Sequence, residues 1–325
     1  MSDEKQVQEI LTNVRESRRV LASQFVDRDR EVDEMMVAAI AQEPLLFIGA
    51  PGTGKSQLIT EFKKMIGISD NEYFEYCLTK FTEPSEILGP LDLNKMKEGS
   101  FHRKTEGKLP LAKVVFLDEV FKSNSAILNT LLTILNEKKF YQDGKPMRVP
   151  MKVLFAATNE IPSMSELDAL KDRFTLKVKI NSVSEERWDD LLVAGLTNDV
   201  HKHQNKSVWL KDDKNSVSLE DFEVLYNHLL TTFTDVVNSG NGSDPYFSQP
   251  LQLEFKKILK HIRHDLEITV SDRKFIKIYK LIRARALFMR GGGVEAEDFK
   301  IMTHLGNSEE EIETLKEELQ TLVGK

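Results

Sequence analysis

Eight consecutive residues constrain the fold of this chain more than any other feature. Residues Gly49 to Ser56 read Gly-Ala-Pro-Gly-Thr-Gly-Lys-Ser and match the pattern G-x-x-x-x-G-K-[ST]. A short apolar run, 44–48, precedes them, and an amphipathic helical pattern follows. Glycines let the backbone wrap closely around a phosphate, and the following helix adds its positive N-terminal end. The context therefore predicts a strand, a phosphate-binding loop and a helix in succession.

The residues of this loop have expected roles in nucleotide binding. The residues expected to surround the phosphates are Gly49, Ala50, Pro51, Gly52, Thr53, Gly54, Lys55 and Ser56. Lys55 should reach the β- and γ-phosphates, and Ser56 should hold Mg²⁺. A glycine turn without a ligand is the competing interpretation, but a tight turn does not need the Lys-Ser pair.

Hydrophobic periodicity predicts an α/β fold. Apolar runs typical of buried strands alternate with helical patterns, which favours a parallel sheet flanked by helices. The expected strands are 44–48, 73–78, 114–117, 153–157 and 174–180. After about residue 181 helical patterns dominate, with a polar loop at 238–250. We therefore expect an α/β nucleotide-binding domain over 1–181 and a smaller, mainly helical domain over 182–325.

Two acidic residues follow the apolar strand 114–117. Ligands of open α/β sheets bind outside the carboxyl ends of the strands, where Asp118 and Glu119 are expected to lie. Asp118 would hold Mg²⁺ through water, and Glu119 would activate the attacking water as a general base. The alternative is a pair of solvated carboxylates. A second acidic residue beyond the metal ligand favours hydrolysis over mere binding.

Three polar residues further along the chain are weaker candidates. Asn159 follows the strand 153–157 and could position water or contact a γ-phosphate, although asparagine is common in loops. Arg173 precedes a strand and, taken alone, would form a surface ion pair with the adjacent Asp172. Arg273 begins a predicted helix, where a cation opposes the helix dipole by roughly 0.3–1 kcal/mol. Arg273 therefore either has an anionic partner or is a screened surface residue.

Composition excludes several classes of protein. The net charge of −7 argues against a broadly basic nucleic-acid-binding surface. Cys77 is the only cysteine, which excludes an intramolecular disulfide and a cysteine-based zinc site. No apolar run approaches the roughly 20 residues that span a bilayer, and the charged N-terminus does not match a signal peptide. We expect a cytoplasmic protein without a membrane span.

Taken together, these segments resemble the MoxR family of AAA+ ATPases. The resemblance rests on the phosphate loop, the VVFLDE strand, the strand ending in AATN, LKDRF at 170–174 and the late SDR at 271–273. The segment 111–150 is similar to MoxR proteins. Three segments are most similar to the RavA subfamily (regulatory ATPase variant A): FTEPSEILGPL at 81–91, the run 114–140 and the run 270–288. The resemblance implies a P-loop NTPase sheet with a helical lid, ATP or ADP with Mg²⁺, and a homohexameric ring with ATP between subunits. It also implies a partner with a von Willebrand factor A domain.

The resemblance also assigns roles to single residues. Asn159 matches the sensor-1 residue, and Arg173 matches the arginine finger that reaches the γ-phosphate of the neighbouring subunit. Arg273 matches the sensor-2 arginine of the lid, which we expect to contact the nucleotide of its own subunit. Phe25 and Val26 precede the first core helix, where the family lines its adenine pocket.

Two segments are expected to be inserted β-hairpins. They cover about 91–104 and 138–149, and the second has Asp143-Gly144 as its turn signal. The resemblance implies that such hairpins face the pore of the ring, although ordinary surface hairpins remain an alternative. The apolar side chains that could grip a substrate there, or instead pack on the domain, are Phe101, Phe140 and Tyr141.

The favoured function is a MoxR/RavA-like ATP hydrolase whose ring remodels or activates a protein client, as a chaperone does. A nucleic-acid-directed motor or loader is an alternative, since related rings carry the same insertions. The net charge disfavours it, whereas the basic segments 104–108 and 283–290 keep it open. A nucleotide-bound scaffold is a further alternative, against which Glu119 argues because a scaffold needs no general base.

Overall fold

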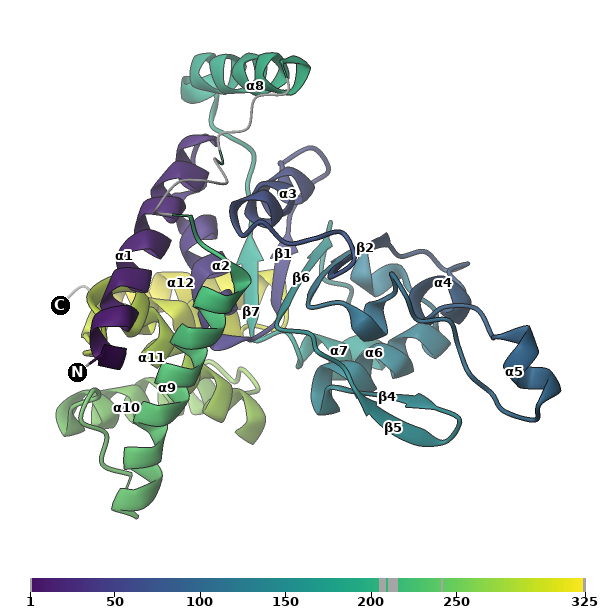
Figure 1. Cartoon of the computed structure of the whole chain (residues 1–325). Coiled ribbons are helices and arrows are strands. Elements are labelled where there is room, and N and C mark those ends of the chain that lie inside the picture. Colours follow the sequence, from purple (N-terminus) through teal and green to yellow (C-terminus); the bar gives the residue numbers. More distant parts are fainter. Residues whose placement is uncertain (1, 205–208, 210–215, 241, 324–325) are drawn as a thin grey trace.

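A five-stranded parallel sheet forms the centre of the molecule, as the sequence predicted. The computed structural model describes residues 2–204, 209, 216–240 and 242–323 (Figure 1). The strand order is β2-β3-β6-β1-β7, and every neighbouring pair is parallel. The strands are β1 (Leu45–Ile48), β2 (Tyr73–Cys77), β3 (Val114–Asp118), β6 (Val153–Thr158) and β7 (Leu176–Lys179).

Alternate residues of the strands face two different apolar cores. In β1, Leu45 and Phe47 pack on the core that includes α1, α2 and the C-terminal helices, whereas Leu46 and Ile48 pack on the opposite core. Burial on both faces explains why this strand is a continuous apolar run. The helices from the N-terminus to the end of the sheet are α1 (Ser2–Ser23), α2 (Asp29–Ala41), α3 (Lys55–Met65), α4 (Pro84–Leu88), α5 (Leu93–Lys97), α6 (Ser125–Glu137) and α7 (Asp168–Lys171).

The C-terminal part is helical, as predicted, and packs directly on the α/β unit. Its elements are α8 (Trp188–His203), α9 (Leu219–Ser239), α10 (Gln249–His264), α11 (Asp272–Arg290), the 3₁₀ segment η5 (Ala296–Leu305) and α12 (Glu309–Val323). Figure 1 shows α8 standing apart from α9–α12, which gather beside α2 and the edge strand β7. Within the described part of the chain, no helix is long and apolar enough to cross a membrane.

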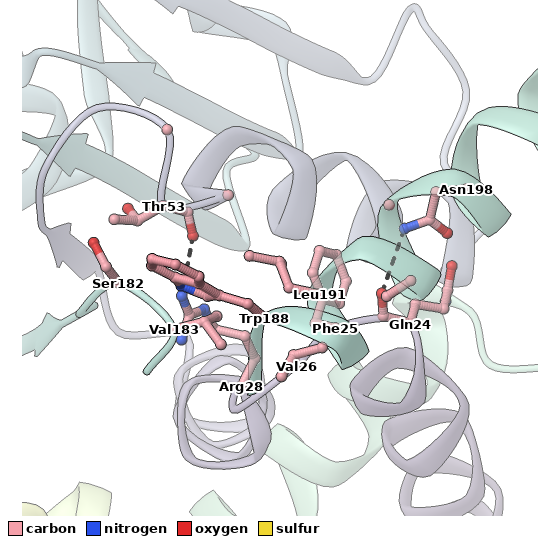
Figure 2. A pocket seen from close by; sticks show the side chains of 14 residues that line it. Gln24, Phe25, Val26, Arg28, Thr53, Ser182, Val183, Trp188, Leu191 and Asn198 are labelled. Atoms are coloured by element: carbon pink, nitrogen blue, oxygen red, sulfur yellow. Dashed lines mark hydrogen bonds between the residues drawn. The ribbon is translucent and has the colours of Figure 1, made fainter. Parts of the chain in front are cut away.

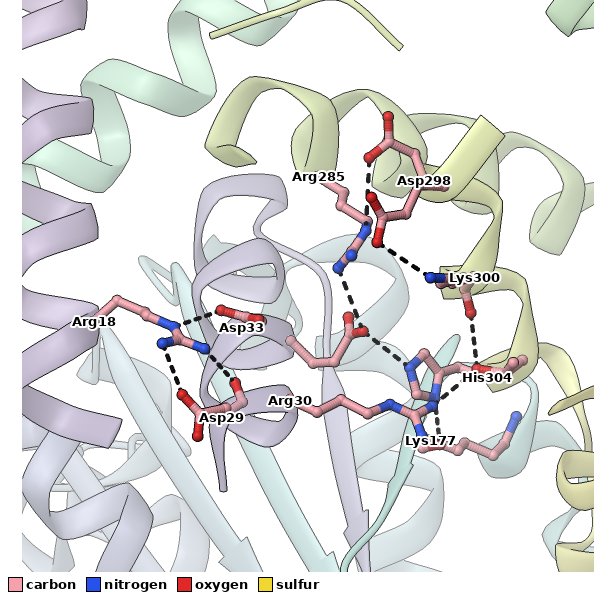
Figure 3. Close-up of polar contacts among 12 residues, drawn as sticks. Arg18, Asp29, Arg30, Asp33, Lys177, Arg285, Asp298, Lys300 and His304 are labelled. Carbon is pink, nitrogen blue, oxygen red and sulfur yellow. Dashed lines mark hydrogen bonds and ion pairs between the residues drawn. The ribbon is translucent and has the colours of Figure 1, made fainter. Parts of the chain in front are cut away.

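A buried polar network joins these C-terminal helices to α2 and β7 (Figure 3). Nε2 of His304 in η5 lies 3.3 Å from Oε1 of Glu34 in α2, and its Nδ1 lies 2.8 Å from the carbonyl oxygen of Lys177 in β7. Burial alone would raise the pKa of Glu34, but attraction to His304 and Arg285 holds it below its usual value. Because both Glu34 and His304 are almost fully buried, the pair fixes one particular docking of the helices on the sheet.

The N-terminal helix α1 was not predicted as an element. It is 22 residues long and buries one apolar stripe, which includes Leu11 and Val14, against α2 and α9. The stripe repeats at helical spacing, so the signal was present in the sequence. α1 thereby joins the first and the last parts of the chain.

The expectation of a β-hairpin at 91–104 is wrong. The segment contains one isolated bridge, Leu91 to Arg103, and the short helix α5. Asp92 caps this helix, since its carboxylate accepts hydrogen bonds from the backbone N–H groups of Asn94 and Lys95. This local cap favours a helical turn over an extended strand.

The segment 138–149 does form a hairpin, as expected. Strands β4 (Lys139–Gln142) and β5 (Lys145–Arg148) pair antiparallel, and the turn residues Asp143 and Gly144 have φ of 52° and 72°. Phe140 is buried in the core beside α6, so it does not project as a gripping side chain. Tyr141, the next residue, is 53% exposed.

The loop expected at 238–250 is shorter and better anchored than its composition suggested. α9 continues to Ser239, and α10 begins at Gln249. Asp244 is buried and pairs with Arg283 of α11, and the hydroxyl of Tyr279 donates to Asp244 at 2.5 Å. A buried ion pair holds the middle of a segment that looks like a flexible linker in the sequence.

Candidate nucleotide-binding site

The phosphate loop leaves β1 at its carboxyl end and enters α3. Gly52 and Gly54 have φ of 84° and 87°, a left-handed conformation that favours glycine. A Cβ on Gly49 would lie 2.3 Å from the carbonyl oxygen of Ile180, so this glycine permits close packing of the loop on the end of β7. α3 begins at Lys55, which places a helix N-terminus at the loop.

Lys55 turns back into the phosphate loop. Its Nζ donates hydrogen bonds to the carbonyl oxygens of Gly49 at 2.6 Å and Ala50 at 3.0 Å. Burial lowers the pKa of this ammonium, whereas Asp118 and Glu119 act in the opposite direction. The charge is thus held where a phosphate bound to the loop would meet it.

Asn159 connects Lys55 to Glu119. Its Nδ2 donates to Oε1 of Glu119 at 2.6 Å, and its Oδ1 accepts a long hydrogen bond from Nζ of Lys55 at 3.5 Å. β6 carries Asn159 to this point because it lies between β3 and β1 in the sheet. Three residues that were separate candidates in the sequence therefore meet at the carboxyl ends of the parallel strands.

Glu119 has an unusual backbone and one unsatisfied oxygen. Its φ is 52°, which is uncommon for a residue other than glycine and is a feature that clusters at functional sites. Lys122 lies 2.9 Å from Oε1, a contact that the sequence reasoning did not anticipate although the two residues are three apart. Oε2 is buried and has no partner among the described groups. That oxygen is free to accept a proton or a hydrogen bond from a water molecule.

The donor set at the loop suits Mg²⁺. Ser56 presents a hydroxyl on the first turn of α3, and Asp118 presents a carboxylate at the end of β3. Mg²⁺ prefers such oxygen ligands and normally takes its remaining ligands from waters and substrate phosphates. In the described part of the chain, no group of three or more His, Cys, Asp or Glu residues could hold a metal by itself. The residues therefore fit a metal that binds together with a nucleotide.

A cavity of about 290 Å³ adjoins the phosphate loop (Figure 2). Gly52, Thr53 and Gly54 form one wall, so the cavity and the loop are continuous. Phe25 and Val26, which the family resemblance assigns to a base pocket, are among the residues that line it. Its other lining residues are Gln24, Arg28, Ser182, Val183, Trp188, Leu191, Ala194, Gly195 and Asn198.

The α8 wall of this cavity was missed in the sequence. Trp188 and Leu191 extend from α8 toward the loop and Phe25 (Figure 2). Nδ2 of Asn198 donates to the carbonyl oxygen of Gln24 at 3.4 Å, which ties α8 to the end of α1. An aromatic ring, aliphatic walls and a side-chain amide suit a flat heteroaromatic base. The available signal for this wall in the sequence was the rarity of tryptophan, since Trp188 is one of only two tryptophans in the chain.

Arg28, in the turn between α1 and α2, stabilises the same region through hydrogen bonds to backbone carbonyl oxygens. Its guanidinium donates to the carbonyl oxygens of Thr53 at 3.3 Å and Asn181 at 2.8 Å. It therefore joins the phosphate loop to the segment that leads from β7 into α8. The sequence offered no pattern that would single out this arginine, because its partners are backbone atoms far along the chain.

Arg173 and Arg273 lie together near the amino end of β7, whereas the phosphate loop lies at the carboxyl ends of the strands. The guanidinium of Arg173 is 3.4 Å from Oδ2 of Asp172, and that of Arg273 is 3.5 Å from the same oxygen. Arg173 precedes β7, whose first residue pairs with Leu45, whereas the phosphate loop follows Ile48. At about 3.3 Å per residue, the two ends of this strand pair are roughly 10 Å apart. Both arginines therefore lie away from the phosphate loop of their own chain.

This position of Arg273 differs from the expectation that it contacts the nucleotide of its own subunit. α11 packs on α2, and the hydroxyl of its N-cap residue Ser271 donates to Oδ1 of Asp172 at 3.0 Å. The docking of α11 thus carries Arg273 to Arg173. The anionic partner expected for Arg273 is Asp172 within the chain.

The two inserted segments meet at their tips. Oδ1 of Asp143 in the hairpin turn accepts a hydrogen bond from the backbone N–H of Phe101 at 3.1 Å, and Oδ2 accepts one from Ser100 at 3.2 Å. Phe101 is 61% exposed. Phe101 and Tyr141 are therefore two exposed aromatic side chains on one connected structure.

Two family models match this chain. The MoxR domain in the MoxR-vWA-beta-propeller ternary systems matches residues 12–218, and the AAA lid domain matches residues 253–319. An uncharacterized protein of Methanocaldococcus jannaschii is 32% identical over 300 residues, which cover 91% of this chain and 71% of that protein.

More distant relatives include a named chaperone and a solved structure. Chaperone MoxR1 of Mycobacterium tuberculosis is 23% identical over 172 residues, which cover 52% of this chain and 44% of MoxR1. The crystal structure of a candidate ATPase from Cytophaga hutchinsonii matches with a TM-score of 0.71 at 17% identity, over 100% of this chain and 97% of that chain. At this identity the structural likeness concerns the fold.

Proposed function

The chain belongs to the MoxR family of AAA+ ATPases, and on this premise we propose that it binds ATP with Mg²⁺ and hydrolyses it to ADP and phosphate. The observation that carries the proposal is the contact of Asn159 with both Lys55 and Glu119, next to a base-sized cavity. A phosphate-binding ammonium and a carboxylate with a free oxygen lie on either side of one amide. A site that only binds a nucleotide needs the ammonium of Lys55 but gains nothing from the free carboxylate oxygen of Glu119.

The nucleotide would lie across the phosphate loop with its base in the cavity lined by Phe25, Val26 and Trp188. Backbone N–H groups of the loop and Lys55 would hold the phosphates, and Ser56 and Asp118 would hold Mg²⁺. The metal supplies charge neutralisation for the phosphates when bound. Because Lys55 now bonds to loop carbonyls, phosphate binding would exchange those hydrogen bonds for stronger charge-assisted ones.

Glu119 is the proposed general base. Its free Oε2 would take the proton of the attacking water, while Asn159 and Lys122 hold Oε1 and fix the orientation of the carboxylate. Asn159 would also donate the second hydrogen of its Nδ2 to the water or the γ-phosphate, since the first is directed at Glu119 and Oδ1 accepts from Lys55. The chain thus supplies positioning and electrostatics, which are the main requirements of phosphoryl transfer.

We propose further that turnover requires a ring of identical subunits, a homohexamer as in the family resemblance. Arg173 and Arg273 lie at the amino ends of the strands, and the phosphate loop lies at the carboxyl ends. The two arginines would therefore serve the nucleotide of the neighbouring subunit. Asp172 would hold both guanidinium groups until a γ-phosphate competes for them. Assembly would thereby gate hydrolysis.

The proposed client is a protein. The exposed aromatic side chains Phe101 and Tyr141 are joined through Asp143 and could grip an unfolded segment. Support for chaperone-like action comes from the named relative MoxR1, and support for a von Willebrand factor A domain partner comes from the systems after which the matching family model is named. The closer kinship with the RavA subfamily stays a prediction, as does cytoplasmic localisation.

A nucleic-acid-directed motor has less support. The basic segments 104–108 and 283–290 supplied that alternative. The arginines of the second segment make internal ion pairs: Arg283 with Asp244, and Arg290 and Arg285 with Asp298. Such paired and largely buried groups offer little charge to a phosphate backbone.

The decisive experiment compares ATP binding and steady-state hydrolysis in three proteins. Glu119→Gln should bind ATP as the unchanged chain does but lose roughly 10²- to 10⁴-fold in turnover, because the isostere cannot accept a proton. Glu160→Gln is the matched control, since this exposed carboxylate follows Asn159 directly and forms no side-chain hydrogen bond or ion pair with the described residues. Turnover of Glu119→Gln within a few-fold of the control would reject Glu119 as the base. Stimulation of hydrolysis by a von Willebrand domain protein, but not by single-stranded DNA or RNA, would favour the proposed partner.

A further inference from the structure

A second, larger cavity lies at the amino ends of the strands, opposite the phosphate loop. Its volume is about 720 Å³. It is bounded by the residues that precede β1, the residues that precede β6, the base of the β4–β5 hairpin and the helices α9 and α11. It adjoins the Arg173 segment, because Lys277 in its wall donates to the carbonyl oxygen of Arg173 at 3.2 Å.

The walls of this cavity are strongly positive, although the chain as a whole is negative. One carboxylate, Glu43, faces five cationic side chains in the lining. The five are Lys138, Arg148, Lys152, Lys277 and Lys280. Like charges on a concave surface raise the local potential and attract anions.

The acidic residues nearby do not neutralise this charge. Glu43 is 8% exposed and bonds to two lysines at once, with Oε2 2.8 Å from Nζ of Lys277 and Oε1 in contact with Lys280. Lys152 pairs with Glu223 at 3.1 Å. Lys138 and Arg148 form no ion pair with any residue that the structure describes, so at least two cations of the cavity are free.

Lys138 is held in place by its backbone. It ends α6 with φ of 52°, and its carbonyl oxygen accepts a hydrogen bond from the N–H of Val149 at 2.8 Å. Burial is the main cause that lowers the pKa of its ammonium to about 8. Attraction to Glu43 opposes the shift, whereas Lys277, Lys280 and Lys152 add to it. A partly buried ammonium without a counter-ion is stabilised when an anion binds beside it.

We propose that this cavity binds a small organic anion that carries two or more phosphate or carboxylate groups. Its volume is in the range of about 300–1,000 Å³ that is typical of small-molecule sites. The free ammonium of Lys138 and the guanidinium fork of Arg148 would bind separate anionic groups. Leu135, Met151 and Tyr226 add apolar surface for the carbon frame of the ligand. This site is distinct from the nucleotide site and does not depend on ATP hydrolysis.

Isothermal titration calorimetry on the full chain carrying Lys55→Ala would test the site, because this change disables the phosphate loop. Fructose 1,6-bisphosphate is the phosphate probe and citrate the carboxylate probe. We expect one equivalent of at least one probe to bind with submillimolar affinity, and the probe that binds tells which oxyanion is preferred. Adding Lys138→Asn and Arg148→Gln should weaken binding at least tenfold. Asparagine tolerates the left-handed backbone of position 138, and Arg148→Gln alone, on an exposed strand, covers the case in which the double variant does not fold.

Lys257→Gln with Lys260→Gln is the matched control. It removes the same charge from exposed positions of α10 and should leave binding unchanged. Absence of binding of both probes at millimolar concentration would overturn the proposal. Equal weakening by the cavity and control variants would also overturn it, because it would indicate a general charge effect. Binding of an RNA oligonucleotide or an acidic polypeptide in place of both probes would reassign the cavity to a macromolecular partner.

Discussion

Nδ2 of Asn159 lies 2.6 Å from Oε1 of Glu119, although the two residues follow different strands of the sheet. The same asparagine accepts a hydrogen bond from Lys55 through its other amide atom. An amide can do both because it carries a donor and an acceptor on one rigid plane. The phosphate loop and the proposed base are thus coupled before any ligand is bound.

Replacing Asn159 should separate binding from turnover. Asn159→Ala leaves Glu119 held by Lys122 alone, so we expect turnover to fall on the order of 10²-fold while ATP affinity changes little. Steady-state kinetics and calorimetry on the same preparations would measure the two effects. Asn129→Ala, an exposed asparagine of α6, is the control and should behave as the unchanged chain does. Equal losses in affinity and turnover would make Asn159 a binding residue instead.

Complementation between subunits would test the proposed role of Arg173. Arg173→Ala and Glu119→Gln should each lower turnover strongly when assembled alone. In mixed assemblies, one type of interface pairs an intact Glu119 with an intact Arg173 of the neighbouring subunit, so part of the activity should return. Mixing Arg173→Ala with Lys55→Ala should also restore activity, whereas two variants of the phosphate loop should not. If no mixture recovers activity, Arg173 acts within its own subunit or only supports the fold.

The base pocket predicts a role for α8 in nucleotide affinity. A stacking contact is worth about 1–3 kcal/mol, so Trp188→Ala should raise the Kd of ATP and ADP alike by roughly 5- to 150-fold. Trp188→Phe should retain most of the affinity, because it keeps a flat ring. Leu192→Ala is the control, since this exposed residue of α8 does not line the pocket. Unchanged affinity in Trp188→Ala would place the base elsewhere.

Glu34 predicts a pH-dependent contribution to stability. Its pKa in the folded chain lies below the ordinary 4.5, so its ion pair stabilises the fold above that pH and the stabilisation is lost as the pH falls through the folded value. His304→Phe should lower the free energy of unfolding at pH 7 by about 3–5 kcal/mol, because it leaves a buried carboxylate with fewer partners. Urea denaturation at pH 7, 5 and 3 would measure both effects. Glu254 of α10 forms no side-chain hydrogen bond or ion pair with the described residues, so Glu254→Gln is the control and should unfold at pH 7 with the same free energy as the unchanged chain. A His304→Phe protein of normal stability would show that the network is energetically neutral.

The sequence by itself determined the phosphate-loop motif and the class of the fold. Residues 49–56 carry their signal in consecutive positions, and the apolar strands before Asp118 and Asn159 show that these residues end buried strands. Such signals are local, since each depends on periodicity or on the conformational freedom of nearby glycines. The error at 91–104 was also local, because Asp92 is a helix cap that the expectation of a hairpin overlooked.

Only the tertiary structure decided which of these residues meet. The order of β3, β6 and β1 in the sheet brings Asn159 between Glu119 and Lys55. The docking of α11 places Arg273 beside Arg173 and away from the phosphate loop of the same chain. The cationic cavity gathers lysines from segments that are more than a hundred residues apart. These contacts depend on how the elements pack, and packing between distant segments leaves no periodic signal in the sequence.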